Sequence, residues 1–352
     1  MTRRYVVLAP DRFAGDAKTA HGVIRYGTDA TVAVIDPSLA GKRVRDAVAY
    51  LDSDAPIVGS IAEALAYEPT ALLIGTAPQG GALPAEWRAH IMDAIAAKLE
   101  IVSGLHDMLG DDVAFAAAAR SAGTTIWDVR KPPDVPLFRG EVYDVPAPIL
   151  LMIGNDCAVG KMTVALELAR AAREAGRQAV FVPTGQTGIM IAGWGISVDR
   201  VIADFAPGAA EQLVMYAARQ HPNLIVVEGQ GAINHPAYAP VTLALMYGCG
   251  ADAMVLVVDP QRDRLSGFQT PTLDYRALIR MHEALIGTVK PAKVVGIALN
   301  TRGLDDAAAR AAIALAKEQT HLPADDLVRY GPHAFYAALG TVEKTAPLAA
   351  NP

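Results

Sequence analysis

Short apolar runs alternate with helix-length amphipathic segments along the whole chain. Apolar runs of strand length, separated by helical patterns, are typical of repeated β-α-β units built around a parallel sheet. In the first part of the chain this pattern predicts strands at 5–8, 31–35, 71–74, 100–102 and 124–128, with helices over 41–51 and 83–98. In the second part it predicts a helix over 161–175 and strands at 149–153, 178–182, 224–227, 254–258 and 293–299. The fold class is therefore α/β.

Two proline-rich stretches, 131–136 and 145–148, interrupt this pattern. Proline restricts both its own backbone and that of the residue before it, so neither stretch suits regular structure. At 352 residues the chain is long enough for two domains. We predict one domain over 1–145 and a second over 146–352.

Composition excludes several classes of protein. An apolar content of 52% and a charged content of 19% rule out extended disorder. No apolar run approaches the roughly 18–20 residues of a membrane helix, so we expect no membrane partner. A net charge of −6 without a basic block argues against nucleic acid. Two cysteines suit a reducing compartment, so we expect a cytoplasmic protein, and the apolar excess favours a homo-oligomer.

A strand, a glycine-bounded loop and a helix follow one another at 149–175. The helix opens with Gly160 and Lys161, so loop N–H groups, the positive end of the helix and an ammonium group would converge there. Such a combination binds phosphate. We predict a phosphate site composed of Gly154, Asn155, Asp156, Cys157, Ala158, Val159, Gly160, Lys161, Met162 and Thr163.

This loop departs from the usual phosphate-loop pattern in two ways. Five residues instead of four separate its glycines, and Met162 follows the lysine where Ser or Thr normally holds Mg²⁺. A thioether is a poor ligand for this hard cation. The sequence thus favours phosphate binding over Mg²⁺-dependent hydrolysis. The loop also holds Cys157, whose pKa the helix N-terminus would lower.

A second motif, Glu228-Gly229-Gln230-Gly231, follows the strand at 224–227. An acid at the carboxyl end of a parallel strand faces the ligand crevice of an open α/β sheet, and glycines let a ligand approach the backbone closely. Glu228 could be a general base, could hold a metal through water, or could cap the next helix.

Further candidates follow other strand ends. Thr184, Gln186 and Thr187 come after the strand at 178–182, and their hydroxyl and amide groups could bind substrate together with Gln230. Asp204 could hold a substrate ammonium, although a surface role fits it equally well. The segment 261–264 carries two arginines whose guanidinium groups could bind a substrate carboxylate, although a solvated charge run explains it better. The eight histidines lack ligand spacing, so we predict no metal site.

The phosphate loop and the Glu228 turn look like those of dethiobiotin synthetase. Segments 104–107, 127–130, 155–161, 184–188 and 228–238 together resemble the D-glutamate N-acetyltransferase-like family, long catalogued as a domain of unknown function. This resemblance spans most of the chain. It implies a Rossmann-like N-terminal domain followed by a P-loop domain of the NTPase type, and it is compatible with Met162 after the lysine.

The resemblance also implies an activity, the transfer of acetyl from acetyl-CoA to the amino group of D-glutamate or a similar amino acid. A phosphate loop without a good Mg²⁺ ligand can still bind the phosphates of CoA. The acceptor ammonium must lose a proton, for which Glu228 and His235 are the candidate bases, and Lys161 with loop amides could stabilise the oxyanion. The alternative is an ATP-dependent kinase or ligase of the dethiobiotin synthetase type, which would use Mg·ATP.

Overall fold

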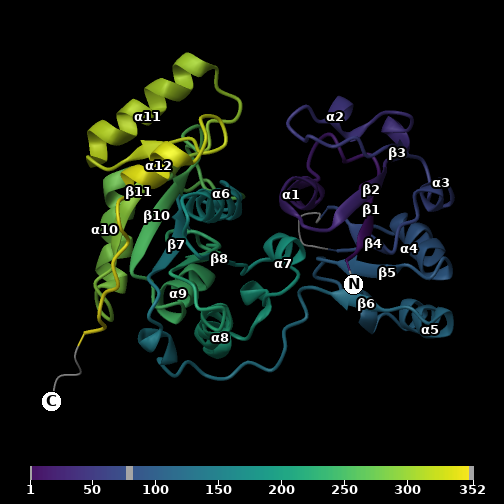
Figure 1. Cartoon of the computed structure of the whole chain (residues 1–352), viewed down its shortest axis with the longest axis horizontal. Coiled ribbons are helices and arrows are strands. Elements are labelled where there is room, and N and C mark those ends of the chain that lie inside the picture. The colour runs from purple at the N-terminus through teal and green to yellow at the C-terminus, as the bar shows by residue number, and fades with distance from the viewer. Residues whose placement is uncertain (1, 77–81, 349–352) are drawn as a thin grey trace. The chain divides into compact units, whose positions relative to one another are not determined.

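The computed structural model describes residues 2–76 and 82–348 (Figure 1). The chain divides into two compact units. Unit 1 contains residues 1–132 and 186–197, and unit 2 contains residues 133–185 and 198–352. The predicted domain boundary near residue 146 stays a prediction. The compact units themselves separate earlier in the chain, after Pro132. No feature of the sequence indicates that residues 186–197 join the first unit.

Unit 1 is built on a six-stranded parallel sheet in the order β3-β2-β1-β4-β5-β6, which is the strand order of Rossmann-like domains. Helices α4 (Trp87–Ala96) and α5 (Val113–Ala122) supply Trp87 and Phe115 to its core. The strands are β1 (Arg4–Leu8), β2 (Ala30–Ile35), β3 (Ile57–Val58), β4 (Ala71–Ile74), β5 (Glu100–Ser103) and β6 (Ile126–Asp128). Helix α1 (Lys18–Tyr26) packs against β4 and against α7 (Gln186–Ala192).

Unit 2 is a second parallel sheet, in the order β12-β11-β10-β7-β9-β8. Strands β7 and β10 are buried along their whole length, which explains their continuous apolar sequences. From β7 the chain builds β8 and β9 on one side and β10 to β12 on the other, so β7 marks the topological switch point where ligands bind in such sheets. The strands are β7 (Ile149–Gly154), β8 (Ala179–Val182), β9 (Leu224–Val227), β10 (Ala253–Val258), β11 (Lys293–Leu299) and β12 (Ala324–Asp325).

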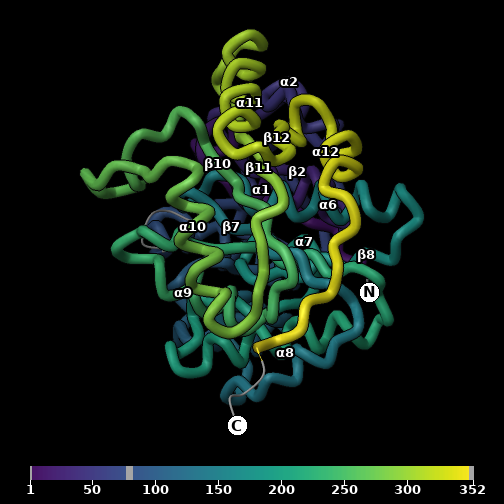
Figure 2. The backbone as a smooth tube through the Cα atoms, turned by 90° about the vertical axis from the view of Figure 1, so that its left-hand side faces the viewer, coloured from purple at the N-terminus to yellow at the C-terminus, as the bar shows by residue number. Residues whose placement is uncertain are grey.

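Helices connect the strands of unit 2. Helix α6 packs on β7, β8 and β9, and α10 packs on β11. The helices are α6 (Lys161–Glu174), α8 (Ala206–Ala218), α9 (Ala239–Gly248), α10 (Tyr275–Ile286), α11 (Asp306–Thr320) and α12 (His333–Ala338). After α12 the chain runs back along this unit (Figure 2), where Thr345 donates its backbone N–H to the buried Asp252 over 2.7 Å.

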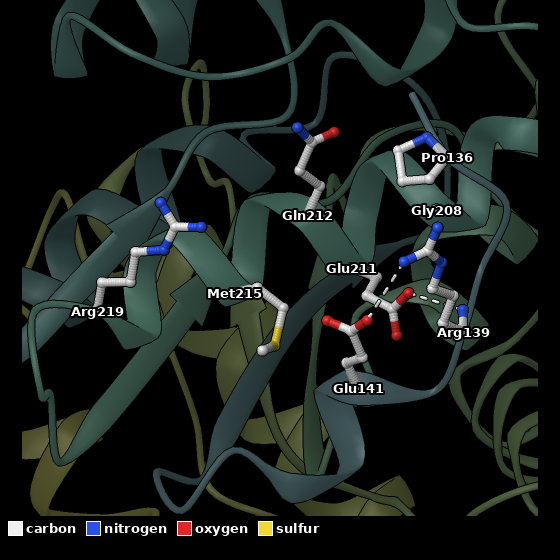
Figure 3. A pocket seen from close by; sticks show the side chains of 8 residues that line it. All are labelled: Pro136, Arg139, Glu141, Gly208, Glu211, Gln212, Met215 and Arg219. Carbon is white, nitrogen blue, oxygen red and sulfur yellow. Dashed lines mark hydrogen bonds and ion pairs between the residues drawn. The ribbon is translucent and has the colours of Figure 1, made fainter. Parts of the chain in front are cut away.

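The proline-rich stretch after Pro132 packs on α8. The buried carboxylate of Glu211 accepts the backbone N–H of Arg139 at 2.8 Å and that of Val142 at 3.3 Å. A small pocket remains between this stretch and the helix (Figure 3). None of the residues that line it is a predicted site residue; they are Pro136, Arg139, Glu141, Gly208, Glu211, Gln212, Met215 and Arg219.

The α/β prediction, with a parallel sheet in each half, is confirmed. The helix predicted over 41–51 is wrong in extent, because only α2 (Val44–Ala47) forms there. The two-residue edge strands β3 and β12 were missed, since two residues carry no readable alternation. No helix in the described parts of the chain combines the length and apolarity that crossing a bilayer requires.

Candidate functional site

The loop between β7 and α6 has the predicted strand–loop–helix form. Gly160 adopts a φ of 113°, a left-handed conformation that side chains disfavour, and directs the chain into α6 at Lys161. Ala158 also has a positive φ, at 56°. On the far side of the loop, Asn300 at the end of β11 donates its amide to the carbonyl of Val159 over 3.1 Å. The loop therefore lies at the carboxyl edge of the sheet, at the switch point.

Lys161 lies within this loop and is buried. Its Nζ donates to the carbonyl of Asp156 over 2.8 Å. A Cβ on Gly154 would lie 3.0 Å from Nζ, and one on Gly229 would lie 3.1 Å from Cδ, so the lysine side chain passes over two glycines. Burial lowers the pKa of Lys161 to about 8, while Cys157 and Asp156 act to raise it. The ammonium is thus held inside the loop, where a phosphate or oxyanion would bind.

Glu228 follows β9, the strand next to β7. Its Oε2 accepts the backbone N–H groups of Thr184 at 2.9 Å and Gly185 at 3.1 Å. Burial raises the pKa of Glu228 to about 7, whereas those two hydrogen bonds and the charge of Lys161 act to lower it. The carboxylate is therefore buried, interacts electrostatically with Lys161 and has a pKa suited to proton transfer at neutral pH.

Two predicted substrate-binding residues accompany Glu228. Gln230 donates its amide to the carbonyl of Thr184, and the Thr184 hydroxyl donates to the carbonyl of Glu228 over 2.9 Å. The carboxyl ends of β8 and β9 are thereby joined. Asp204 lies exposed on a 3₁₀ turn, Ala203–Phe205, in the same unit.

Gln186 and Thr187 begin α7 and belong to unit 1. The Gln186 amide donates to the Thr19 hydroxyl over 3.1 Å, and the Thr187 hydroxyl lies 3.2 Å from the same oxygen. These contacts anchor α7 to α1. A substrate role for either residue stays a prediction.

His235 is completely buried, and both ring nitrogens have partners. Nδ1 lies 3.2 Å from the N–H of Ala237, which it accepts, so Nε2 carries the proton and donates it to the carbonyl of Ser266 over 3.1 Å. A base must have a nitrogen available for the incoming proton. Of the two predicted bases, the geometry favours Glu228.

Residue pattern alone missed the role of Arg262. Instead of belonging to a solvated charge run, its Nη1 pairs with the buried carboxylate of Asp156 at 2.7 Å. The same Asp156 oxygen accepts the N–H of Ser266 at 2.8 Å, and the other accepts the N–H of Cys157 at 2.7 Å. The loop after β10 thus braces the phosphate loop. The sequence around Arg262 does not indicate that its ion-pair partner is Asp156, which lies more than a hundred positions earlier.

Asp156, Cys157 and His235 place donor atoms within 4.8 Å of one another, a spacing that a metal ion could bridge. Their chemistry does not fit one. The Asp156 carboxylate already pairs with Arg262, and the His235 nitrogen nearest to it, 3.8 Å away, carries a proton. The expected lowering of the Cys157 pKa is wrong, because burial raises the pKa of this thiol.

Comparison with known proteins bears on both units. The model of a domain of unknown function described as DUF1611_C, a P-loop domain, matches residues 136–336, and the matching DUF1611_N Rossmann-like domain covers residues 37–132. A crystal structure of a DUF1611 family protein from Anabaena variabilis superposes with a TM-score of 0.91 at 36% identity, over 96% of this chain and 99% of that one.

Two curated relatives carry the name D-glutamate N-acetyltransferase. The protein from Tritonibacter scottomollicae is 35% identical over 288 residues, which is 80% of this chain and 85% of its own length. The protein from a Pseudoalteromonas species is 37% identical over 244 residues, or 69% of this chain and 73% of its own.

Proposed function

Because this chain belongs to the DUF1611 family of paired Rossmann-like and P-loop domains, we propose that it is an N-acetyltransferase that moves acetyl from acetyl-CoA to the amino group of D-glutamate or a close analogue. The names of the two relatives support N-acetyl transfer. The donor and the acceptor are our inference. The observation that carries it is a buried carboxylate, Glu228, with a pKa of about 7, on the strand next to the one that leads into the phosphate loop of Lys161.

The donor would bind through its phosphates to the loop at 154–163. Loop N–H groups, the start of α6 and the Lys161 ammonium supply positive potential without a metal. Met162 stands where a Mg²⁺-binding hydroxyl would be needed for nucleotide hydrolysis. Binding a phosphorylated carrier such as CoA does not require a Mg²⁺-binding hydroxyl, so the loop suits CoA better than Mg·ATP.

In the proposed reaction Glu228 removes a proton from the acceptor ammonium. Since Oε2 already accepts two N–H groups, Oε1 would take the proton. The freed amine attacks the thioester carbonyl, so that a C–N bond forms and the carbonyl oxygen becomes an oxyanion, which Lys161 and loop amides stabilise. The C–S bond then breaks and the CoA thiolate leaves; the new nitrogen gives up its second proton, the thiolate takes up a proton, and the neutral amide remains.

The test is an assay of acetyl transfer with acetyl-CoA and D-glutamate, following the release of free CoA thiol, with L-glutamate and Mg·ATP run in parallel. We expect D-glutamate-dependent thiol release and no ATP-dependent product. Lys161→Ala should lower kcat/KM by about 10²- to 10³-fold, the usual effect of losing an oxyanion donor. Lys293→Ala, which removes an exposed lysine of the same unit, should leave it unchanged. ADP formation without thiol release would overturn the proposal in favour of the kinase or ligase.

A further inference from the structure

Two large aromatic side chains stand exposed on the loops that flank the phosphate loop. Tyr238, on the loop after β9, is 51% exposed, and Phe268, on the loop after β10, is 41% exposed. Single exposed aromatics are common, but two on facing loops at a ligand-binding edge form a specific surface. We call Tyr238 and Phe268 the aromatic pair.

The aromatic pair is held by a buried imidazole. The ring of His235 lies 4.6 Å from that of Tyr238, tilted by 33°, and 5.2 Å from that of Phe268, at 87°. Because both nitrogens of His235 are hydrogen-bonded to backbone, the imidazole has a fixed orientation. One face of Tyr238 is thus packed against a rigid support while half of the residue remains open to solvent.

The same contacts tie the aromatic pair to the phosphate loop. The carbonyl of Ser266 accepts from His235, and its N–H donates to Asp156 in the loop over 2.8 Å. Nε2 of His235 lies 3.8 Å from the other oxygen of that carboxylate. Both aromatic rings therefore stand one residue away from the loop, within reach of a flat group attached to phosphates bound there.

We propose that the open face of Tyr238, flanked by Phe268, stacks on the adenine base of the phosphorylated ligand. This inference rests on the proposed function for the placement of phosphates on the loop. A base offers a π-face to an aromatic ring whatever its hydrogen-bonding edge, and removing such a ring costs about 1–3 kcal/mol of binding. A hydrophobic side chain of similar size but no π-face would not replace it fully.

The test compares Tyr238→Leu with Tyr238→Phe by calorimetric titration of CoA, adenosine 3′,5′-bisphosphate, 4′-phosphopantetheine and Mg·ADP. We expect Tyr238→Leu to weaken binding of CoA and the bisphosphate by at least about fivefold, the low end of the stacking range. Binding of 4′-phosphopantetheine, which has a phosphate but no base, should not change, and Tyr238→Phe should bind like the wild type. Tyr67→Leu, an exposed tyrosine of unit 1, is the control.

Equal losses for base-bearing and base-free ligands, or no loss for CoA in a folded Tyr238→Leu protein, would overturn the stacking proposal. If instead wild-type protein binds Mg·ADP but no CoA, and Tyr238→Leu weakens that binding, stacking is supported while acetyl-CoA as the donor fails. A wild-type protein that binds CoA with a Tyr238-independent affinity leaves the donor supported and removes the stacking. The two failures are therefore distinguishable.

Discussion

The carboxyl ends of the two parallel sheets both carry buried acids, but the hydrogen bonds of those acids differ. In unit 1, Asp36 after β2 accepts the N–H of Phe13 on one oxygen and that of Ser38 on the other, each at 3.0 Å. Asp128 at the end of β6 divides its oxygens in the same way between the N–H groups of Leu109 and Gly110. In unit 2, Glu228 takes both of its backbone N–H groups on Oε2.

That difference separates structural from chemical carboxylates. An acid with both oxygens committed to backbone N–H groups fixes a loop, and taking a proton on either oxygen would weaken the bond which that oxygen accepts. Glu228 can be protonated on Oε1 without losing either. Of the buried lysines among the described residues, Lys161 lies at this edge, whereas Lys290 precedes β11 and pairs with the buried Asp252 at 2.7 Å. We infer that the acids at this edge of unit 1 serve folding, whereas unit 2 adds to loop-fixing acids such as Asp156 one carboxylate, Glu228, that is available for chemistry.

Glu228→Gln should have the largest effect, because it removes the one carboxylate in this comparison that we assign to chemistry. The amide oxygen can still accept from Thr184 and Gly185, so the fold should persist, but the amide cannot take a proton. We expect kcat/KM for acetyl transfer to fall by about 10²- to 10⁴-fold, the range for loss of a general base. In the wild type kcat/KM should rise as pH increases through about 7, because the base must be deprotonated, and the variant should lack this inflection.

The stability of the same two proteins provides the control. A carboxyl whose pKa rises from 4.5 to about 7 on folding stabilises the protein fully below pH 4.5, and this stabilisation disappears as pH rises through about 7. The shift corresponds to about 3 kcal/mol. Denaturant unfolding of unit 2 between pH 4.5 and 8 should show this decline in the wild type and not in Glu228→Gln. A flat wild-type profile would contradict the raised pKa.

The second prediction concerns glycines that follow central strands in the two sheets. A Cβ on Gly229 would lie 1.6 Å from the backbone oxygen of Met152, whereas one on Gly75 would lie 2.5 Å from a methyl of Val7 and no closer than 3.0 Å to a strand carbonyl, that of Leu8. A side-chain methyl can rotate away, but a strand carbonyl in a ladder cannot. Gly229→Ala should cost about 3 kcal/mol or more and Gly75→Ala about 1–2 kcal/mol, the range for overpacking.

Amide hydrogen exchange can assign each loss to its own sheet, since protection reports local opening. Gly229→Ala should expose β7 and β9, and with them the phosphate loop, while β1 and β4 stay protected. If Gly75→Ala lowered the stability more than Gly229→Ala, the site in unit 2 would not depend on closer packing than the corresponding edge of unit 1.

How much the sequence predicts follows from how far apart the interacting residues lie. The sequence predicts long buried strands such as β7 and β10, and also the loop from Gly154 to Lys161. In each case the residues that form the pattern lie within a few positions of one another. The pairing of Asp156 with Arg262 was not, since it depends on β7 and β10 being neighbours. The sequence likewise does not predict that α7 belongs to unit 1, because the residue that anchors it, Thr19, lies far earlier in the chain.

The mildest prediction tests the structural side of the comparison through Asp36→Asn. Asparagine keeps one acceptor oxygen but presents an NH₂ group to either the Phe13 or the Ser38 N–H, leaving a buried donor unpaired at a cost of about 1–3 kcal/mol. Unit 1 should lose this stability, measured by hydrogen exchange in β2, while acetyl transfer per folded molecule is unchanged. Asp16→Asn, at an exposed ion pair with Arg12, should change stability by less than about 1 kcal/mol. A loss of activity with full stability would place Asp36 in contact with a ligand, and the division between a folding edge and a chemical edge would then be wrong.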